Sequence, residues 1–270
     1  MKRKKEVLGL LLMLGVSLSS CNRVADLEYP QVEEGQGLLS LTLGTTADFA
    51  TRAVTEADYV STDNYTVVVT DKDGVEKMNC SGSEVADNMP LFLSVGSYTV
   101  KAFYGKEHPA SRDEFYVFGE TCGTIKADQQ EPVEVMCTPT CGRITVNFDK
   151  SMADYYSSYD VKFSGTKALE GKTIDWKKND TEPWYVLLDE GGETISFTIT
   201  TTPKDEFVNN LQQGNTKKGT FELKRNKAYK MNISANYTPT IFGDLDITIT
   251  IDDSTNDIPV DIEVPIEWTE

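Results

Sequence analysis

Few residues of this chain have side chains suited to catalysis, because histidine, the commonest acid or base, occurs once in 270 residues. His108 lies between Gly-Lys-Glu and Pro109, a composition typical of an exposed turn. Neither a glycine-rich phosphate loop nor a Gly-x-Ser-x-Gly nucleophile motif occurs. The 43 acidic residues provide carboxylate pairs at almost every spacing, so such pairs do not identify a glycosidase. We therefore expect a protein that is not an enzyme and that binds no cofactor.

Cysteine is the other reactive side chain. Besides Cys21, the chain contains Cys80, Cys122, Cys137 and Cys141, an even number that is compatible with disulfides in an exported protein. Three pairings of these four residues are open. Cys137 and Cys141 have the spacing of two zinc ligands, but no second pair of Cys or His completes four ligands. We therefore expect no metal.

Residues 1–20 have the three parts of a secretory signal: basic residues at 2–5, an apolar stretch at 7–16 and small residues before Cys21. The apolar stretch has only about half the length that a membrane-spanning helix needs. The run Leu18-Ser19-Ser20-Cys21 resembles the bacterial lipoprotein signal, in which the cysteine becomes the acylated N-terminus. This resemblance implies that Cys21 carries acyl chains such as palmitate, which bind the protein to outer-membrane lipid.

The chain is strongly acidic, with a formal net charge of −17 that becomes −20 when residues 1–20 are removed. Nucleic-acid binding requires Lys and Arg that neutralise phosphates, so this charge excludes nucleic acid as a partner. Residues 21–37 combine four acidic residues with one proline and two glycines. This composition predicts a flexible tether between the lipid and the first folded domain.

From residue 38 onward, apolar and polar residues alternate, and β-branched and aromatic residues dominate. The pattern predicts an all-β protein with few short helices, at 150–158 and 204–212. Turn signals between the strands favour antiparallel sandwiches over a parallel sheet. A proline-containing break at 138–140 divides the chain into an N-terminal β-sandwich domain, 38–138, and a C-terminal one, 139–270. The predicted strands are 39–43, 65–70, 90–95, 98–104, 115–118, 133–137, 143–148, 159–163, 184–188, 194–202, 219–223, 229–237 and 245–251. The strands 90–95 and 98–104 are predicted to form a hairpin around Gly96 and Ser97.

The last predicted strand is the most regular, with Ile258, Val260, Ile262, Val264 and Ile266 on one face. Two prolines on its other face remove ladder hydrogen bonds, so the segment must lie at the edge of a sheet. It either closes its own domain or serves as a donor strand for another subunit.

Trp176, Trp184 and Tyr185 are the residues best suited to stack against a sugar ring. Aromatic residues of a β-sandwich more often fill its core, and alternation alone does not tell which face they occupy. A glycan platform and a core position therefore both remain open at this stage.

Several short motifs follow one another in an order that resembles the fimbrillin-like cell-adhesion lipoproteins of Bacteroidales-type bacteria, in a branch defined by a domain of unknown function. The motifs are residues 37–43, 50–53, 64–74, 93–102 and 264–268. The resemblance implies two transthyretin-like β-sandwich domains with Greek-key topology. It also implies cleavage between Arg52 and Ala53 by a protease, after which the first strand, with Leu39, Leu41 and Leu43, leaves and a neighbouring subunit supplies a replacement.

The function expected from the sequence is that of a lipid-anchored cell-surface adhesin or fimbrial (pilus) subunit. Its partners would be other fimbrial subunits or a host-surface protein or glycan. The alternative is a surface glycan-binding lipoprotein of a polysaccharide-uptake system, which would use the region of Trp176 and Trp184. The expected location is the outer membrane, at the cell surface or in a fimbrium.

Overall fold

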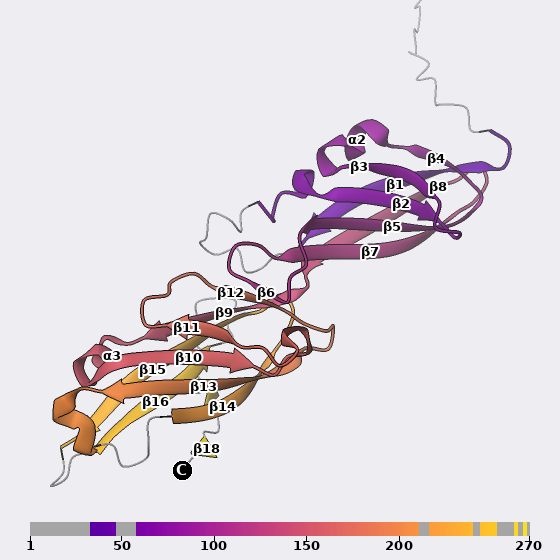
Figure 1. The fold of residues 1–270 in the computed structure, drawn as a ribbon. Helices are drawn as coiled ribbons and strands as arrows, with labels where there is room; N and C mark the ends of the chain where they lie inside the picture. The colour runs from indigo at the N-terminus through magenta and orange to yellow at the C-terminus, as the bar shows by residue number, and fades with distance from the viewer. Residues whose placement is uncertain are drawn as a thin grey trace, which may run out of the picture.

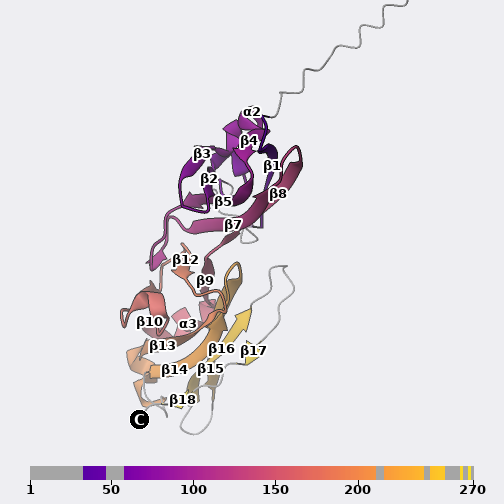
Figure 2. The ribbon, with the colours of Figure 1, turned by 90° about the vertical axis from the view of Figure 1, so that its right-hand side faces the viewer.

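A computed structural model describes residues 33–46, 58–210, 216–239, 244–252, 262–263 and 267–268. Within these residues the chain is all-β, with long strands and only short helices (Figure 1). We call the described residues up to 139 the N-terminal part and those from 141 onward the C-terminal part. The two parts are stacked end to end, which makes the molecule elongated (Figure 2).

One sheet forms the N-terminal part, with the strand order β3-β2-β5-β7-β8-β1-β4. Pairing of Val117 with Pro139 joins the start of β7 to the end of β8, and the sheet folds over at this point to enclose a core. The strands are β1 (Gln36–Thr45), β2 (Thr66–Asp71), β3 (Glu76–Ser81), β4 (Leu91–Ser94), β5 (Gly96–Gly105), β7 (Tyr116–Ile125) and β8 (Gln130–Pro139). The short helices are η1 (Thr62–Asn64), η2 (Gly82–Glu84) and α2 (Val85–Asn88).

Two sheets that enclose a second core form the C-terminal part, with the orders β11-β10-β13-β14-β18 and β17-β16-β15-β9-β12-β6. Strand β6 (Ala110–Ser111) comes from the N-terminal part. The other strands are β9 (Cys141–Phe148), β10 (Tyr156–Ser164), β11 (Ile174–Lys177), β12 (Trp184–Leu187), β13 (Glu193–Pro203), β14 (Thr216–Leu223), β15 (Ala228–Thr238), β16 (Asp244–Asp252), β17 (Ile262–Glu263) and β18 (Glu267–Trp268). The short helices are α3 (Lys150–Tyr155), η3 (Lys167–Leu169) and η4 (Asp205–Asn210).

Alternation along the strands decides which side chains enter the two cores. In β2 the side chain of Val67 is buried, whereas the neighbouring Thr66 and Val68 are only partly covered. Because successive side chains of a strand point to opposite faces, the buried ones gather between the layers. Each fully buried Val or Leu contributes about 1.5–3 kcal/mol to the free energy of unfolding.

The two parts repeat the same pairing pattern. In the N-terminal part β1 lies between β4, which is antiparallel to it, and β8, which is parallel. In the C-terminal part β9 lies in the same way between the antiparallel β12 and the parallel β15. The four neighbouring strands β3-β2-β5-β7 of the N-terminal part also correspond to the four strands β11-β10-β13-β14 of the C-terminal part, since all neighbouring pairs in both sets are antiparallel.

Some local predictions differ from the structure. The predicted hairpin of 90–95 and 98–104 is wrong, because β4 pairs with β1, whereas β5 pairs with β2 and β7. The predicted helix 150–158 ends at Tyr155, where β10 begins, and 204–212 contains the 3-10 helix η4. The strands β3 and β11, both at sheet edges, were not predicted. The predicted division at 138 and 139 falls at the end of β8.

Candidate functional site

The predicted exchangeable strand is β1, which is held unequally on its two sides. It pairs with β8 from Leu38 to Thr45, but with β4 only from Gln36 to Leu39. Leu39 is fully buried, and Leu41 and Leu43 are partly buried against the same core. The apolar face of β1 therefore lies on the core, as the alternation predicts, and its C-terminal half has one recorded strand partner.

The C-terminal end of β1 is tied to both parts of the molecule. The hydroxyl groups of Thr45 and Tyr65 lie 3.2 Å apart, and the Tyr65 hydroxyl donates to the carbonyl of Tyr59 at 2.8 Å. Burial raises the pKa of Tyr65 to about 12. In the C-terminal part, Asn226 donates through Nδ2 to the carbonyl of Thr46 at 2.6 Å. Loss of β1 would thus also remove a contact between the two parts.

Other predicted site residues lie outside the described residues, namely Cys21, Arg52, Ala53, Ile258, Val260, Val264 and Ile266. Of the terminal segment, Ile262 belongs to β17 and is paired with Ile251 of β16. In β18, Trp268 is paired with Lys217 of β14. The segment thus contacts an edge of each sheet of the C-terminal part.

The predicted glycan platform is not a surface in the structure. Trp176 is 1% exposed and belongs to the second core, and Tyr185 is 4% exposed and belongs to the first. Trp184 is partly buried, and its Nε1 donates to the carbonyl of Asp175 at 3.0 Å. Sugar stacking needs an accessible ring face, so of the two alternatives left open by the sequence, the core position is the one that Trp176 and Tyr185 occupy.

These tryptophans instead hold an arginine that was not predicted. The guanidinium carbon of Arg112 lies 5.0 Å from the ring centroid of Trp176 and 4.4 Å from that of Trp184. Arg112 also donates to the carboxylate of Asp180 at 2.7 Å, to the carbonyl of Asp175 at 3.0 Å and to the carbonyl of Glu182. A planar guanidinium suits such a site because it stacks on rings and donates in its own plane.

Arg112 belongs to a strap, residues 106–115, which connects β5 to β7 and joins the two parts. Within the strap, β6 pairs with β12, and the amide of Leu187 donates to the carbonyl of Pro109 at 3.1 Å. The ring of Phe115 lies 4.6 Å from that of Tyr185. We call the contacts between the N-terminal and C-terminal parts the junction. The strap adds a strand, an ion pair and an aromatic contact to it.

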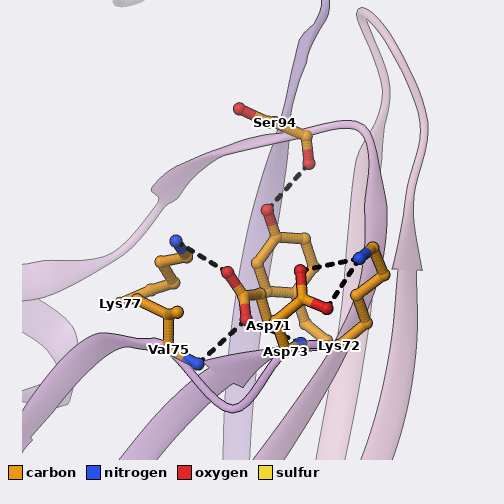
Figure 3. A network of polar contacts seen from close by, with 7 residues as sticks. Asp71, Lys72, Asp73, Val75, Lys77 and Ser94 are labelled. Carbon is orange, nitrogen blue, oxygen red and sulfur yellow. Dashed lines mark hydrogen bonds and ion pairs between the residues drawn. The ribbon is translucent and has the colours of Figure 1, made fainter.

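The end of the N-terminal part that lies away from the junction carries a polar network (Figure 3). The carboxylate of Asp71 accepts from the amides of Asp73 and Val75, each at 2.9 Å, and forms an ion pair of 2.9 Å with Lys77. Lys77, and then the Val75 amide, hold the pKa of Asp71 below its usual value. Lys72 pairs with Asp73 at 2.6 Å. The turn of the β2–β3 hairpin is thus fixed by its own side chains.

A pocket of about 370 Å³ lies beside this network. Its polar wall is formed by the charged residues of the β2–β3 hairpin, and its apolar wall by Phe92, Leu93 and Val95. At the back, the Tyr98 hydroxyl donates to the carbonyl of Ser94 at 3.0 Å. This pocket was not predicted, because its walls come from turns that are separate in the sequence.

Within the described ranges of the chain, the reactive side chains are not gathered into a catalytic group. His108 Nε2 lies 2.7 Å from the Glu114 carboxylate, at the molecular surface. Among the described residues, no cluster of three or more His, Cys, Asp or Glu could hold a metal ion, and no helix is long and apolar enough to cross a membrane.

Among the described residues, no disulfide joins any two of Cys80, Cys122, Cys137 and Cys141. Cys122 is exposed, Cys80 is partly exposed, and Cys137 and Cys141 are buried. Burial raises the pKa of the Cys137 thiol to about 11. The disulfides that an even number of cysteines allowed are thus not formed in this structure.

Comparison with solved structures finds matches among proteins from Parabacteroides and Bacteroides. A fimbrial assembly protein from Parabacteroides distasonis is 12% identical, with a TM-score of 0.43, over 87% of this chain and 99% of that chain. A protein described as a putative adhesin from Bacteroides ovatus is 10% identical, with a TM-score of 0.43, over 87% and 95%. Putative polysaccharide binding proteins from Bacteroides thetaiotaomicron are 12% identical, with a TM-score of 0.35, over 73% and 91%.

At these identities and TM-scores the likeness carries no inference about binding. A search of curated proteins finds no match. The family model described as domain of unknown function DUF4493 matches residues 35–266, from the first turn before β1 almost to the end of the chain. The chain therefore belongs to the DUF4493 family.

Proposed function

We propose that this protein is a lipid-anchored adhesin or fimbrial subunit of the cell surface, built from two tandem transthyretin-like sandwich domains, 38–138 and 139–270. The repeated pairing of β1 and β9 supports two domains of one topology. The signal, Cys21 and the acidic tether support export and anchoring in outer-membrane lipid. The observation that carries the function is the unequal pairing of β1.

Unequal pairing suits a strand that is exchanged during assembly. Release of β1 would expose the place of Leu39 and leave the backbone of β8 unpaired from residues 130 to 137. An incoming strand with alternating apolar residues would restore both the burial and the ladder. The exchange breaks the long ladder between β1 and β8 and the short ladder between β1 and β4, which has only four pairs.

Cleavage at Arg52 is the proposed trigger, since this residue follows β1 in the sequence and precedes η1. The other arginines near strand ends are held by hydrogen bonds: Arg112 in the strap, and Arg225, whose Nε donates to the carbonyl of Leu188 at 2.7 Å. A protease needs its target segment to leave the fold, so these two sites resist cleavage.

An arginine-specific protease tests this proposal. The purified protein should be cut after Arg52, release the segment that contains β1 and form oligomers on a native gel. The matched control is Arg52→Lys, which keeps the charge but is not cut by such a protease. A protein that is cut and remains monomeric would exclude assembly by strand exchange.

The terminal segment has two proposed roles. Pairing of β17 with β16 and of β18 with β14 favours closure of its own sandwich. A donor strand would have to leave both pairs. Deletion of residues 258–270 distinguishes the roles: closure predicts a less stable protein, whereas a donor role predicts an equally stable protein that no longer extends an oligomer after cleavage.

A further inference from the structure

Gly37 is the position on the core face of β1 that has no side chain. The apolar residues of this face, Leu39, Leu41 and Leu43, pack against the first core. Gly37 is itself buried and is paired with Leu93 of β4. The core face of β1 therefore has the pattern Gly-x-Leu-x-Leu-x-Leu, in which the first position holds no apolar side chain.

A side chain at position 37 would collide with parts of the fold that have no room to move. A Cβ atom on Gly37 would overlap the carbonyl oxygen of Lys126 and would lie 2.8 Å from Cγ2 of Ile125, where carbon atoms need about 3.5–4.0 Å. Ile125 is fully buried, so its close-packed neighbours leave it no free space. The backbone of Gly37 has no positive φ, so this collision, and not backbone strain, excludes a larger residue.

The turn between β7 and β8, residues 126–129, is fixed against β1. The amide of Leu38 donates to the carbonyl of Gln129 at 2.9 Å, and the amide of Asp128 donates to the carbonyl of Gln36 at 2.9 Å. These two hydrogen bonds lie on either side of position 37. The turn can therefore make room for a side chain only by giving up the hydrogen bonds that pair its backbone with β1.

Gly44, near the other end of β1, is not restricted in this way. The atoms that a Cβ on Gly44 would meet belong to the side chain of Met136. Met136 is 45% exposed, and its unbranched side chain can turn into solvent. Alanine should therefore be tolerated at position 44, which makes Gly44 a matched control for Gly37 in the same strand.

We call the space that release of β1 leaves between β4, β8 and the turn 126–129 the β1 groove. We propose that the β1 groove selects a replacing strand with glycine two residues before its first buried apolar side chain. This inference rests on the strand exchange proposed above and names the kind of strand that the exchange takes. A strand that runs in the direction of β1 without this glycine has to leave the groove before the turn, so it loses the pairs that β1 makes with Leu93 and Ser94.

This selection distinguishes two kinds of partner. No glycine occurs among residues 244–270, so the terminal segment of a second copy can cover the β1 groove only from the position of Leu38 onward. A subunit that presents the pattern Gly-x-apolar-x-apolar-x-apolar, as β1 does, fills the whole groove and pairs with both β4 and β8. The stronger partner is therefore a strand of the second kind.

Binding of synthetic peptides to the protein cut after Arg52 tests the selection. The peptides are a copy of residues 36–45, the same copy with Gly37→Ala, and the same copy with Gly44→Ala. Fluorescence anisotropy of labelled peptides should give a dissociation constant at least about tenfold higher for Gly37→Ala, the range expected for overpacking, and within about threefold of the copy for Gly44→Ala. A peptide of residues 38–45, which has nothing at position 37, should bind at least as tightly as the Gly37→Ala peptide.

The same substitutions in the uncleaved protein test the collision without strand exchange. In urea, Gly37→Ala should raise the equilibrium constant of unfolding at least about tenfold, whereas Gly44→Ala should change it by less than about threefold. Equal effects of the two substitutions, on unfolding or on peptide binding, would overturn the proposed selection. A copy of β1 that does not bind at all would refute strand exchange itself, and the selection with it. Failure of the selection alone is recognised by a copy and a Gly37→Ala peptide that bind equally well.

Discussion

Replacing Arg112 by alanine is expected to weaken the junction between the two parts. The guanidinium donates to the carboxylate of Asp180, and charge-assisted hydrogen bonds of this kind contribute about 1.5–3 kcal/mol each. Stacking between Trp176 and Trp184 adds about 0.5–2 kcal/mol. Asp180 is 31% exposed, so water can solvate it after the substitution and reduces the loss. The expected decrease in the free energy of unfolding is about 2–4 kcal/mol.

Urea unfolding followed by tryptophan fluorescence measures this loss, because two of the three tryptophans contact Arg112. Fluorescence reports the C-terminal part, which contains all three tryptophans, and circular dichroism reports both parts; by circular dichroism the variant should unfold in two transitions, where the wild type unfolds in one. Arg112→Lys is the matched control; it keeps the charge but not the planar fork, and should recover less than half of the lost stability. A change below about 0.5 kcal/mol for Arg112→Ala, the range of an ordinary surface substitution, would refute the assignment of the strap as a junction.

Three further results are expected. Leu39→Ala should lower the free energy of unfolding by about 2–5 kcal/mol in urea, because Leu39 is fully buried in the core under β1. Tyr65 and Tyr156 have pKa values raised by burial to about 12, so stability should fall as the pH rises from 10 to 12, and ultraviolet absorbance should show both ionising after the exposed tyrosines. With a thiol reagent at pH 8, Cys122 should react at once and Cys137 only after denaturation; rapid reaction of Cys137 would contradict its burial.

The sequence was informative about strands whose two faces differ. Alternation predicted β2 and β16 because apolar residues recur at every second position where one face meets the core. β3 was missed because Met78 is its one buried apolar residue, as is usual for an edge strand. The partner of β4 was mistaken, because pairing between distant strands is set by packing and leaves no local signal.

The candidate sites depended on contacts that a sequence does not display. Trp176 was weighed both as core and as sugar platform, and only its neighbours in space decide between them. Arg112 gave no signal, since its acceptors lie about 70 positions further along the chain. The pocket at the other end of the N-terminal part was also not predicted, because it is lined by two turns and by the start of β1, which are far apart in the sequence.

The repeated pairing pattern gives the molecule a direction. β1 and β9 hold equivalent places, but β9 is joined on both sides to strands and helices of the fold, by β8 before it and α3 after it. One cut after β1 separates that strand from everything that follows, whereas β9 would need two. Under the proposed exchange, a single cleavage after β1 would make the N-terminal part the receptor. A polymer made by this route would grow with one polarity, and a copy that keeps its first strand would end it.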